Sequence, residues 1–179
     1  MISTSRIAFG AALGCAVLAL AGSVPAGAQD AATLLGVSRD WSAFTSGSGS
    51  AKICYVIGKP ASTAPKAKRD PIYFLITDYP GRRVKSEPEV VPGYQYKDGS
   101  TVTATVGTDK FEFFTKNDAG AGAAWVRQRA DEVRLIEAMR RGSTMLVTGT
   151  SKRGTVTKDT YSLGGLGDAL DKIHASCGM

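Results

Sequence analysis

The sequence has few of the residues on which most catalytic and metal sites depend. It contains one histidine, His174, and three cysteines among 179 residues. A metal site needs several clustered ligands, and no His/Cys cluster remains if two of the cysteines pair with each other. No G-x-S-x-G element is present, although a Ser/His/Asp triad can be assembled from residues far apart in sequence. We therefore expect no catalytic residues, no metal and no cofactor.

The remaining acid–base side chains give weak signals. His174 follows Ile173 on an expected helix, which favours a solvated or edge-packed side chain over a catalyst. Glu87 and Glu89 fall on one side of an extended segment, an arrangement that is common at surface edges. A hydrolase would require these groups to gather with a nucleophile in a concave site.

Long hydrophobic runs are absent after the N-terminal segment. Arg6, the apolar run 7–21 and Ala26-Gly27-Ala28 form the charged region, hydrophobic region and A-x-A cleavage site of a secretory signal peptide. The alternatives are an uncleaved membrane anchor, for which the run is short, and a lipoprotein at Cys15. We expect residues 1–28 to be removed and the mature protein to lie in the periplasm or cell envelope, or to be secreted.

Cleavage near Ala28 leaves two cysteines, Cys54 and Cys177. In an oxidising compartment such a pair usually forms one structural disulfide. A redox-active pair is the alternative, but it would favour a C-x-x-C spacing or a helix start that stabilises the thiolate. The sequence therefore predicts a disulfide that fixes the C-terminal end of the chain to an early strand.

Positive charge exceeds negative charge, with a formal net charge of +6. The excess suggests peripheral contact with anionic surfaces such as phospholipid head groups, and solubility is the alternative interpretation. The basic residues are scattered in pairs along loops and element ends, without a helical stripe or interleaved aromatic residues. We therefore expect no nucleic-acid partner.

Strand-like segments dominate the chain after residue 37. Residues 29–37 are small and apolar and predict a flexible lead-in. Strands are expected at 41–45, 52–57, 72–77, 89–96, 101–106, 110–115, 145–147 and 155–163. Such short strands at regular spacing indicate a β-sandwich or barrel. Residues 52–57 and 72–77 are apolar on both faces, so we expect central strands with a second sheet on one face and a helix on the other.

Turn signals predict how some of these strands connect. Asp98-Gly99 predicts a hairpin that pairs 89–96 with 101–106. Residues 118–124 are rich in glycine and alanine and predict a loop. The last two strands are expected to form a hairpin around Lys152-Arg153-Gly154.

Two helices are predicted. Apolar spacing, early acids and late arginines predict a helix over 126–141 that ends before Gly142. The second is predicted over 165–176. Its apolar face contains Leu166, Leu170, Ile173 and Cys177. A disulfide from Cys177 to Cys54 would hold this helix against a central strand.

A series of short motifs runs along the chain in a fixed order. They are Lys52-Ile53-Cys54-Tyr55, Gly93-Tyr94, Ala124-Trp125, residues 137–142, residues 149–155, Asp159-Thr160-Tyr161-Ser162-Leu163 and the terminal Cys177. With these motifs the chain resembles the invasion-associated locus B proteins of alphaproteobacteria over about residues 38–177. Extra glycines in residues 162–167 depart from the family pattern. The resemblance implies one domain, residues 38–179, folded as an immunoglobulin-like antiparallel β-sandwich with two helices, one of them C-terminal.

These observations favour a non-enzymatic envelope protein that binds a protein, lipid or glycan partner. The alternatives are a host-cell adhesion or invasion factor, which the resemblance implies, and a hydrolase of envelope polymers. Motifs are densest in the final hairpin, so the candidate binding residues are Arg153, Lys158, Asp159, Thr160 and Tyr161. The competing interpretation is that Tyr161 packs in the core and Asp159-Thr160 holds a turn.

Overall fold

Strands are the dominant secondary structure in this computed structural model, which describes residues 31–69 and 71–179. Within those residues one antiparallel sheet has the order β1-β2-β3-β5-β6-β9-β8-β7-β10-β11-β4. The strands are β1 (Thr33–Ser38), β2 (Trp41–Ser46), β3 (Ile53–Gly58), β4 (Ser62–Ala64), β5 (Tyr73–Tyr79), β6 (Val84–Val91), β7 (Thr101–Val106), β8 (Asp109–Asp118), β9 (Ala121–Val126), β10 (Thr144–Thr150) and β11 (Val156–Ser162). The helices are α1 (Arg129–Arg141) and α2 (Leu166–Cys177). The expected mainly β, antiparallel, single-domain fold with two helices is confirmed, and its immunoglobulin-like detail stays a prediction.

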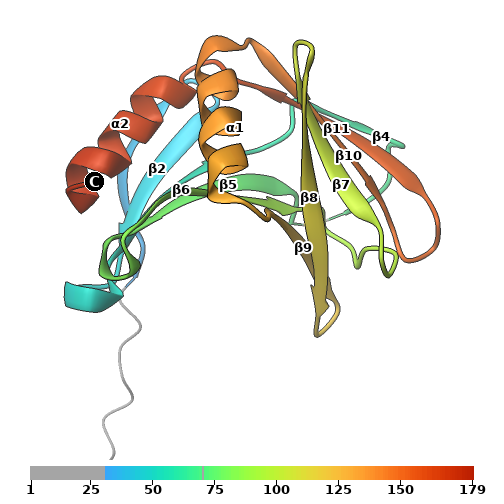
Figure 1. The fold of residues 1–179 in the computed structure, drawn as a ribbon, viewed down its shortest axis with the longest axis horizontal. Helices are drawn as coiled ribbons and strands as arrows, with labels where there is room; N and C mark the ends of the chain where they lie inside the picture. Colours follow the sequence, from blue (N-terminus) through green and yellow to red (C-terminus); the bar gives the residue numbers. More distant parts are fainter. Residues whose placement is uncertain (1–30, 70) are drawn as a thin grey trace, which may run out of the picture.

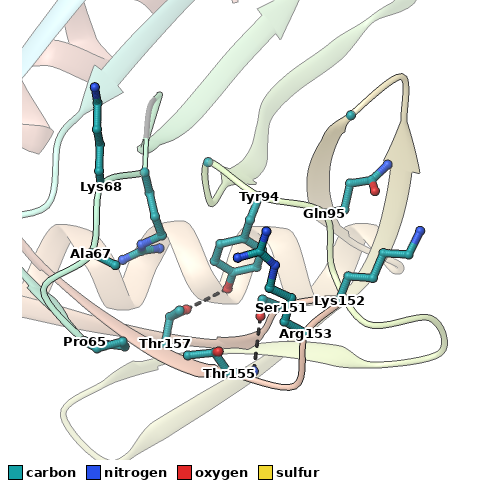
Figure 2. Close-up of a pocket in the computed structure, with 13 residues that line it drawn as sticks. Pro65, Ala67, Lys68, Tyr94, Gln95, Ser151, Lys152, Arg153, Thr155 and Thr157 are labelled. Atoms are coloured by element: carbon teal, nitrogen blue, oxygen red, sulfur yellow. Dashed lines mark hydrogen bonds between the residues drawn. The ribbon is translucent and has the colours of Figure 1, made fainter.

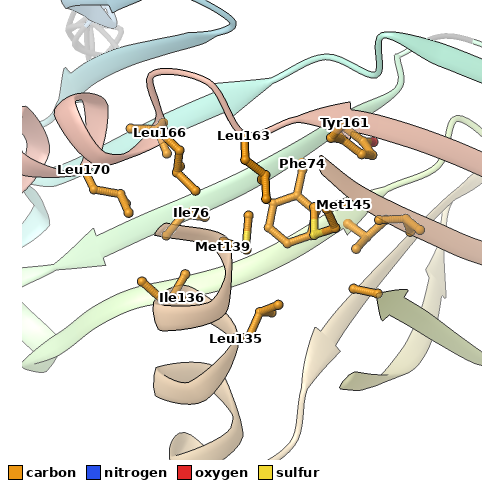
Figure 3. Packing of buried hydrophobic residues seen from close by; sticks show 14 of the residues in the cluster. Phe74, Ile76, Leu135, Ile136, Met139, Met145, Tyr161, Leu163, Leu166 and Leu170 are labelled. Atoms are coloured by element: carbon orange, nitrogen blue, oxygen red, sulfur yellow. The ribbon is translucent and has the colours of Figure 1, made fainter. Parts of the chain in front are cut away.

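The sheet bends so that its two ends share one core (Figure 1). The ring of Phe74 on β5 lies 6.1 Å from that of Phe113 on β8 and 5.9 Å from that of Tyr161 on β11, in edge-to-face contacts that aromatic pairs favour. Leu135 and Met139 reach the same core from α1 (Figure 3). The inner face of the sheet and the two helices therefore enclose a single hydrophobic core.

Helix α2 has the apolar face that its sequence predicts. Leu166, Leu170 and Ile173 are fully buried, and each such side chain contributes about 1.5–3 kcal/mol. Cys177 forms the predicted disulfide with Cys54 on β3, with the two Cα atoms 6.0 Å apart. The sequence prediction of this helix and of its covalent attachment is confirmed. Within the described residues, neither helix has the length and apolar character needed to cross a bilayer.

The extra glycines before α2 have a local cause. Gly165 is the N-cap residue and has φ of +86°, a left-handed conformation that glycine adopts without strain. A Cβ at this position would lie 2.0 Å from the backbone oxygen of Ser38. Glycine at position 165 therefore allows the start of α2 to pass close to the end of β1.

The expectation of a flexible lead-in over residues 29–37 is wrong for most of that segment. Residues 33–38 form strand β1, which pairs antiparallel with β2 at the edge of the sheet. The sequence does not predict this strand because the segment lacks the alternation that a half-buried strand shows. Its apolar residues Leu34 and Val37 stay largely exposed in the structure. The folded domain therefore begins before residue 38. The predicted signal peptide, residues 1–28, lies outside the described residues.

The expectation that β3 and β5 are covered on both faces is wrong. Cys54 and Val56 of β3 and Phe74 and Ile76 of β5 are fully buried. On the opposite face Thr77 is buried, but the other residues of both strands are only half-buried. The second part of the sheet and α2 both lie on the buried face. Half-exposed aromatic and β-branched side chains look the same in sequence as covered ones, which explains the error.

Two predicted connections also differ from the structure. Strand β7 pairs with β8 and β10 rather than with residues 89–96, although Gly99 does occupy a turn with φ of +71°. Residues 121–126 form β9 instead of a loop, so α1 begins at Arg129 rather than at residue 126. A Cβ on Gly122 would lie 2.5 Å from the backbone oxygen of Tyr94, so a close approach selects small residues in this strand. The predicted β10–β11 hairpin is confirmed.

Reducing the Cys54–Cys177 bond should lower the free energy of unfolding by about 2–5 kcal/mol, because the unfolded chain regains the freedom that a long closed loop removes. The measurement is the urea midpoint of the mature protein with and without a thiol reductant. The Cys54→Ala/Cys177→Ala double variant is the control and should not respond to the reductant. Equal midpoints for the oxidised and reduced native chain would contradict this prediction.

Candidate functional site: a basic cleft

A cleft of about 460 Å³ lies beside the β10–β11 hairpin (Figure 2). Four segments that are distant in sequence form its walls. They are residues 65–69 after β4, residues 93–95 after β6, Gly120 in the β8–β9 turn, and residues 151–157 of the hairpin. The cavity volume falls within the range of about 300–1,000 Å³ that small-molecule sites occupy.

The cleft has a positively charged lining. Lys68, Arg69, Lys152 and Arg153 contribute side chains, and no aspartate or glutamate is among the described residues that line it. In Figure 2, Lys68 and Lys152 lie on opposite sides of Tyr94 and Arg153. The arrangement favours a ligand that carries negative charge.

A buried ion pair supports the base of the cleft. The Arg69 guanidinium donates hydrogen bonds to both carboxylate oxygens of Asp159, and Nη1 also donates to the Pro92 carbonyl at 3.0 Å. Only 7% of the Arg69 side chain and 4% of the Asp159 side chain are exposed. Burial alone would lower the pKa of Arg69, but the hydrogen bonds and charge of Asp159 more than offset it and the pKa is raised. Arg69 therefore stays charged while buried.

Tyr94 connects this ion pair to the hairpin. Its hydroxyl lies 2.6 Å from Thr157 Oγ1, and the Arg69 guanidinium lies 5.5 Å from the centre of its ring. Burial raises the pKa of Tyr94, so the phenol is neutral at physiological pH. Tyr94, Thr157, Arg69 and Asp159 thus form one polar network that fixes the base of the cleft.

The five residues proposed from sequence separate into two groups. Arg153 lines the cleft, and Lys158 is exposed on β11 outside the cleft lining. Asp159 and Tyr161 are buried, and Thr160 is half-buried beside β4. Successive residues of a strand point to opposite faces, so these five cannot form one surface. Asp159 and Tyr161 are therefore not surface binding residues. Tyr161 packs in the core, as the competing interpretation expected, and Asp159 anchors Arg69 instead of holding a turn.

Sequence reasoning identified only Arg153 of the cleft lining and missed, among others, Lys68, Arg69, Tyr94 and Lys152. Tyr94 belongs to the Gly93-Tyr94 motif, and that tyrosine was the available signal. Arg69 lies in a loop rich in proline and lysine, where nothing local distinguishes a buried arginine from an exposed one.

A second polar cluster lies beneath α2. His174 Nε2 is 2.9 Å from Ser86 Oγ and 3.7 Å from Asp78 Oδ1. His174 and Ser86 border a cavity of about 280 Å³ next to α1, and Asp78 is fully buried behind them. Burial, together with the charges of Lys85 and Arg140, lowers the pKa of His174 to about 4. Burial raises the pKa of Asp78, against the hydrogen bond from Ser86 N–H. His174 is therefore not solvated but partly buried and packed at the edge of α2, in agreement with the edge-packed alternative.

This cluster differs from a Ser/His/Asp triad. In a triad the carboxylate orients the ring nitrogen opposite the serine, whereas here Asp78 approaches the same Nε2 atom that contacts Ser86. Glu87 and Glu89 lie on the other face of the sheet from His174, where burial and the charge of Glu87 raise the pKa of Glu89. Among residues 31–69 and 71–179, no group of three His, Cys, Asp or Glu side chains is arranged to hold a metal ion.

Comparisons with known proteins give one family and one fold. The family model described as "Invasion associated locus B (IalB) protein" matches residues 41–174. The chain is similar to the crystal structure of invasion associated protein B from Bartonella henselae, with 13% sequence identity and a TM-score of 0.57 over 80% of this chain and 98% of that chain. At this identity the structural likeness supports the fold alone. A comparison with curated proteins gave no match.

Replacing Arg69 by alanine should destabilise the protein by about 3–5 kcal/mol, because Asp159 would remain as an unpaired buried charge. The double variant Arg69→Met/Asp159→Leu should recover most of that loss, since apolar residues of similar size remove both charges together. Urea unfolding of the three proteins measures the difference. A double variant no more stable than Arg69→Ala would show that the ion pair itself, and not the stranded charge, determines stability.

Acidification should weaken the packing of α2 through His174. Its folded pKa of about 4 lies below the ordinary value of 6.5, so its contribution to stability is complete above pH 6.5 and is lost as pH falls towards 4. Asp78, with a raised pKa, has the opposite dependence. The urea midpoint of the wild type should fall more steeply than that of His174→Asn between pH 6.5 and 4, so that the difference between the two midpoints changes with pH. Parallel curves would contradict the prediction.

Proposed function

The chain belongs to the invasion associated locus B (IalB) family, and from this premise we propose that it is an exported envelope protein that binds a partner through the basic cleft without converting it. The charged and hydrophobic N-terminal regions with their A-x-A site support export. The Cys54–Cys177 bond supports an oxidising compartment such as the periplasm.

The main support for the proposal is that the side chains at the base of the cleft are held in place by contacts within the protein. Arg69 is buried against Asp159, and Tyr94 is held by Thr157, so these side chains are ordered before any partner arrives. A preordered site loses less conformational entropy on binding, and its affinity rises accordingly. The exposed Lys152 adds charge at the rim of this fixed base.

A host-facing adhesion or invasion role is a narrower version of the same proposal. It is supported by the family description and by the name of the Bartonella henselae protein, which both contain the words "invasion associated". It requires the partner to belong to a host cell instead of the bacterial envelope.

Photocrosslinking in intact cells tests the proposal. The full chain, with a C-terminal tag, is produced in an alphaproteobacterial host and should be released by osmotic shock as a mature form that begins at Gln29. A photoreactive benzoyl-phenylalanine at Thr155, which lines the cleft, should give discrete adducts with envelope components. Arg153→Glu should remove these adducts because it reverses a charge in the cleft.

Two matched controls come from the same hairpin. Val156 is the next residue, is 53% exposed and lies outside the cleft lining, so the same photoreactive group there should give no discrete adduct. Lys158→Glu also reverses one charge on the hairpin and should leave the Thr155 adducts unchanged. Adducts that are equal at both positions, or a protein retained in the cytoplasm, would overturn the proposal. Adducts formed only when host cells are added would favour the host-facing version.

A further inference from the structure

We propose that the cleft recognises an acidic saccharide, with its basic rim binding the carboxylate and its hydroxyl-bearing wall binding the sugar ring; this inference rests on the proposed function. The same oxyanion chemistry is presented by a phosphorylated sugar. Three features of the cleft support the inference: its charge, an unused buried donor, and its polar lining.

Among the described residues of the cleft, no acidic side chain compensates the positive charge at the rim. Arg69 is neutralised by Asp159, which leaves Lys68, Lys152 and Arg153 as the remaining cations of the lining. None of these three takes part in an ion pair among the described residues. Three cations around one cavity create a positive potential that attracts an anion and that salt screens beyond about 10 Å at 0.1 M ionic strength.

An unused donor lies in the buried part of the site. The Nε atom of Arg69 is buried and has no hydrogen-bond partner among the described residues, although both terminal nitrogens of the guanidinium are bonded. Buried donors are almost always satisfied in folded proteins. A ligand oxygen or an ordered water that reaches the base of the cleft would satisfy it. This donor is the second feature, independent of the surface lysines, that points to an oxygen-rich ligand.

The walls suit a polyhydroxylated ring better than a bare ion or an acyl chain. Ser151, Thr155 and Thr157 contribute hydroxyl groups, and Gln95 contributes an amide. Figure 2 shows two of these groups already held, with Ser151 Oγ accepting from Thr155 N–H at 3.2 Å and Thr157 bonded to Tyr94. A cavity of about 460 Å³ is far larger than one inorganic phosphate needs, and it matches a small organic ligand.

The experiment measures binding to the whole mature protein, with its disulfide intact, by calorimetry at low and physiological salt. The probes are trigalacturonate, its neutral methyl ester, inorganic phosphate, galactose-1-phosphate and a short polyglutamate peptide. Trigalacturonate should bind at least tenfold more tightly than the methyl ester and phosphate, and its affinity should fall as salt rises. Tighter binding of galactose-1-phosphate than of trigalacturonate would assign the oxyanion to a phosphorylated sugar. It would overturn the proposal that the rim binds a carboxylate.

Charge-neutralising variants locate the binding. Lys152→Gln/Arg153→Gln should weaken trigalacturonate binding at least tenfold, whereas Lys110→Gln/Lys158→Gln changes the net charge equally outside the cleft and should leave it unchanged. Thermal unfolding confirms that both variants are folded. Equal weakening by the two variants would show nonspecific attraction and overturn the proposal.

The remaining outcomes separate this inference from the proposed function. Inorganic phosphate that binds as tightly as the saccharide, or polyglutamate that binds more tightly, overturns the saccharide and leaves a binding cleft. Failure of all probes while the Thr155 adducts persist also overturns only the saccharide. Failure of the probes together with loss of the adducts overturns both.

Discussion

The attachment of α2 to the inner face of the sheet is the constraint on which the rest of the structure depends. The bond from Cys54 to Cys177 is covalent, and one helical turn earlier His174 contacts Ser86. Cys54 pairs in register with Asp78, so the covalent and polar contacts meet at neighbouring positions of β3 and β5. Together they keep the apolar face of α2 over strands that would otherwise expose their buried side, and the shared core requires that cover.

The elements that sequence could predict are those specified by local periodicity. The apolar face of α2 and the β10–β11 hairpin follow spacing that neighbouring residues contain on their own, and the cysteine pair has one partner available after cleavage. Strand β1 is not predicted because Leu34 and Val37 stay exposed and leave the segment without a buried alternating face. Strand β9 is not predicted because its small residues are explained by contact with a distant segment. Gly122 is small because the backbone of Tyr94 passes close to it, and no neighbour in sequence indicates that approach.

The cleft was only partly accessible to sequence reasoning for the same physical reason. Arg153 was identified because it lies in a dense motif, whereas Arg69 is 90 residues away from the aspartate that holds it. The motif around Asp159 does belong to the cleft region, but Asp159 is polar because it binds Arg69 at the base of the cleft and not because it contacts a ligand. A pattern in one strand cannot show which alternate residues face a cavity until the opposite wall is placed.

Strand β11 joins the core to the cleft, and this continuity explains how the base of the cleft is fixed. Its inward residues are Tyr161, which packs against Phe74, then Asp159, which holds Arg69, then Thr157, which holds Tyr94. Towards the hairpin turn, apolar packing at Tyr161 is followed by hydrogen bonds at Asp159 and Thr157. The base of the cleft therefore inherits the rigidity of the core, while the long basic side chains at its rim stay free to adapt to a ligand. A rigid base with mobile charged side chains at the rim suits ligand recognition, because on binding only the rim side chains that contact the ligand need to become ordered.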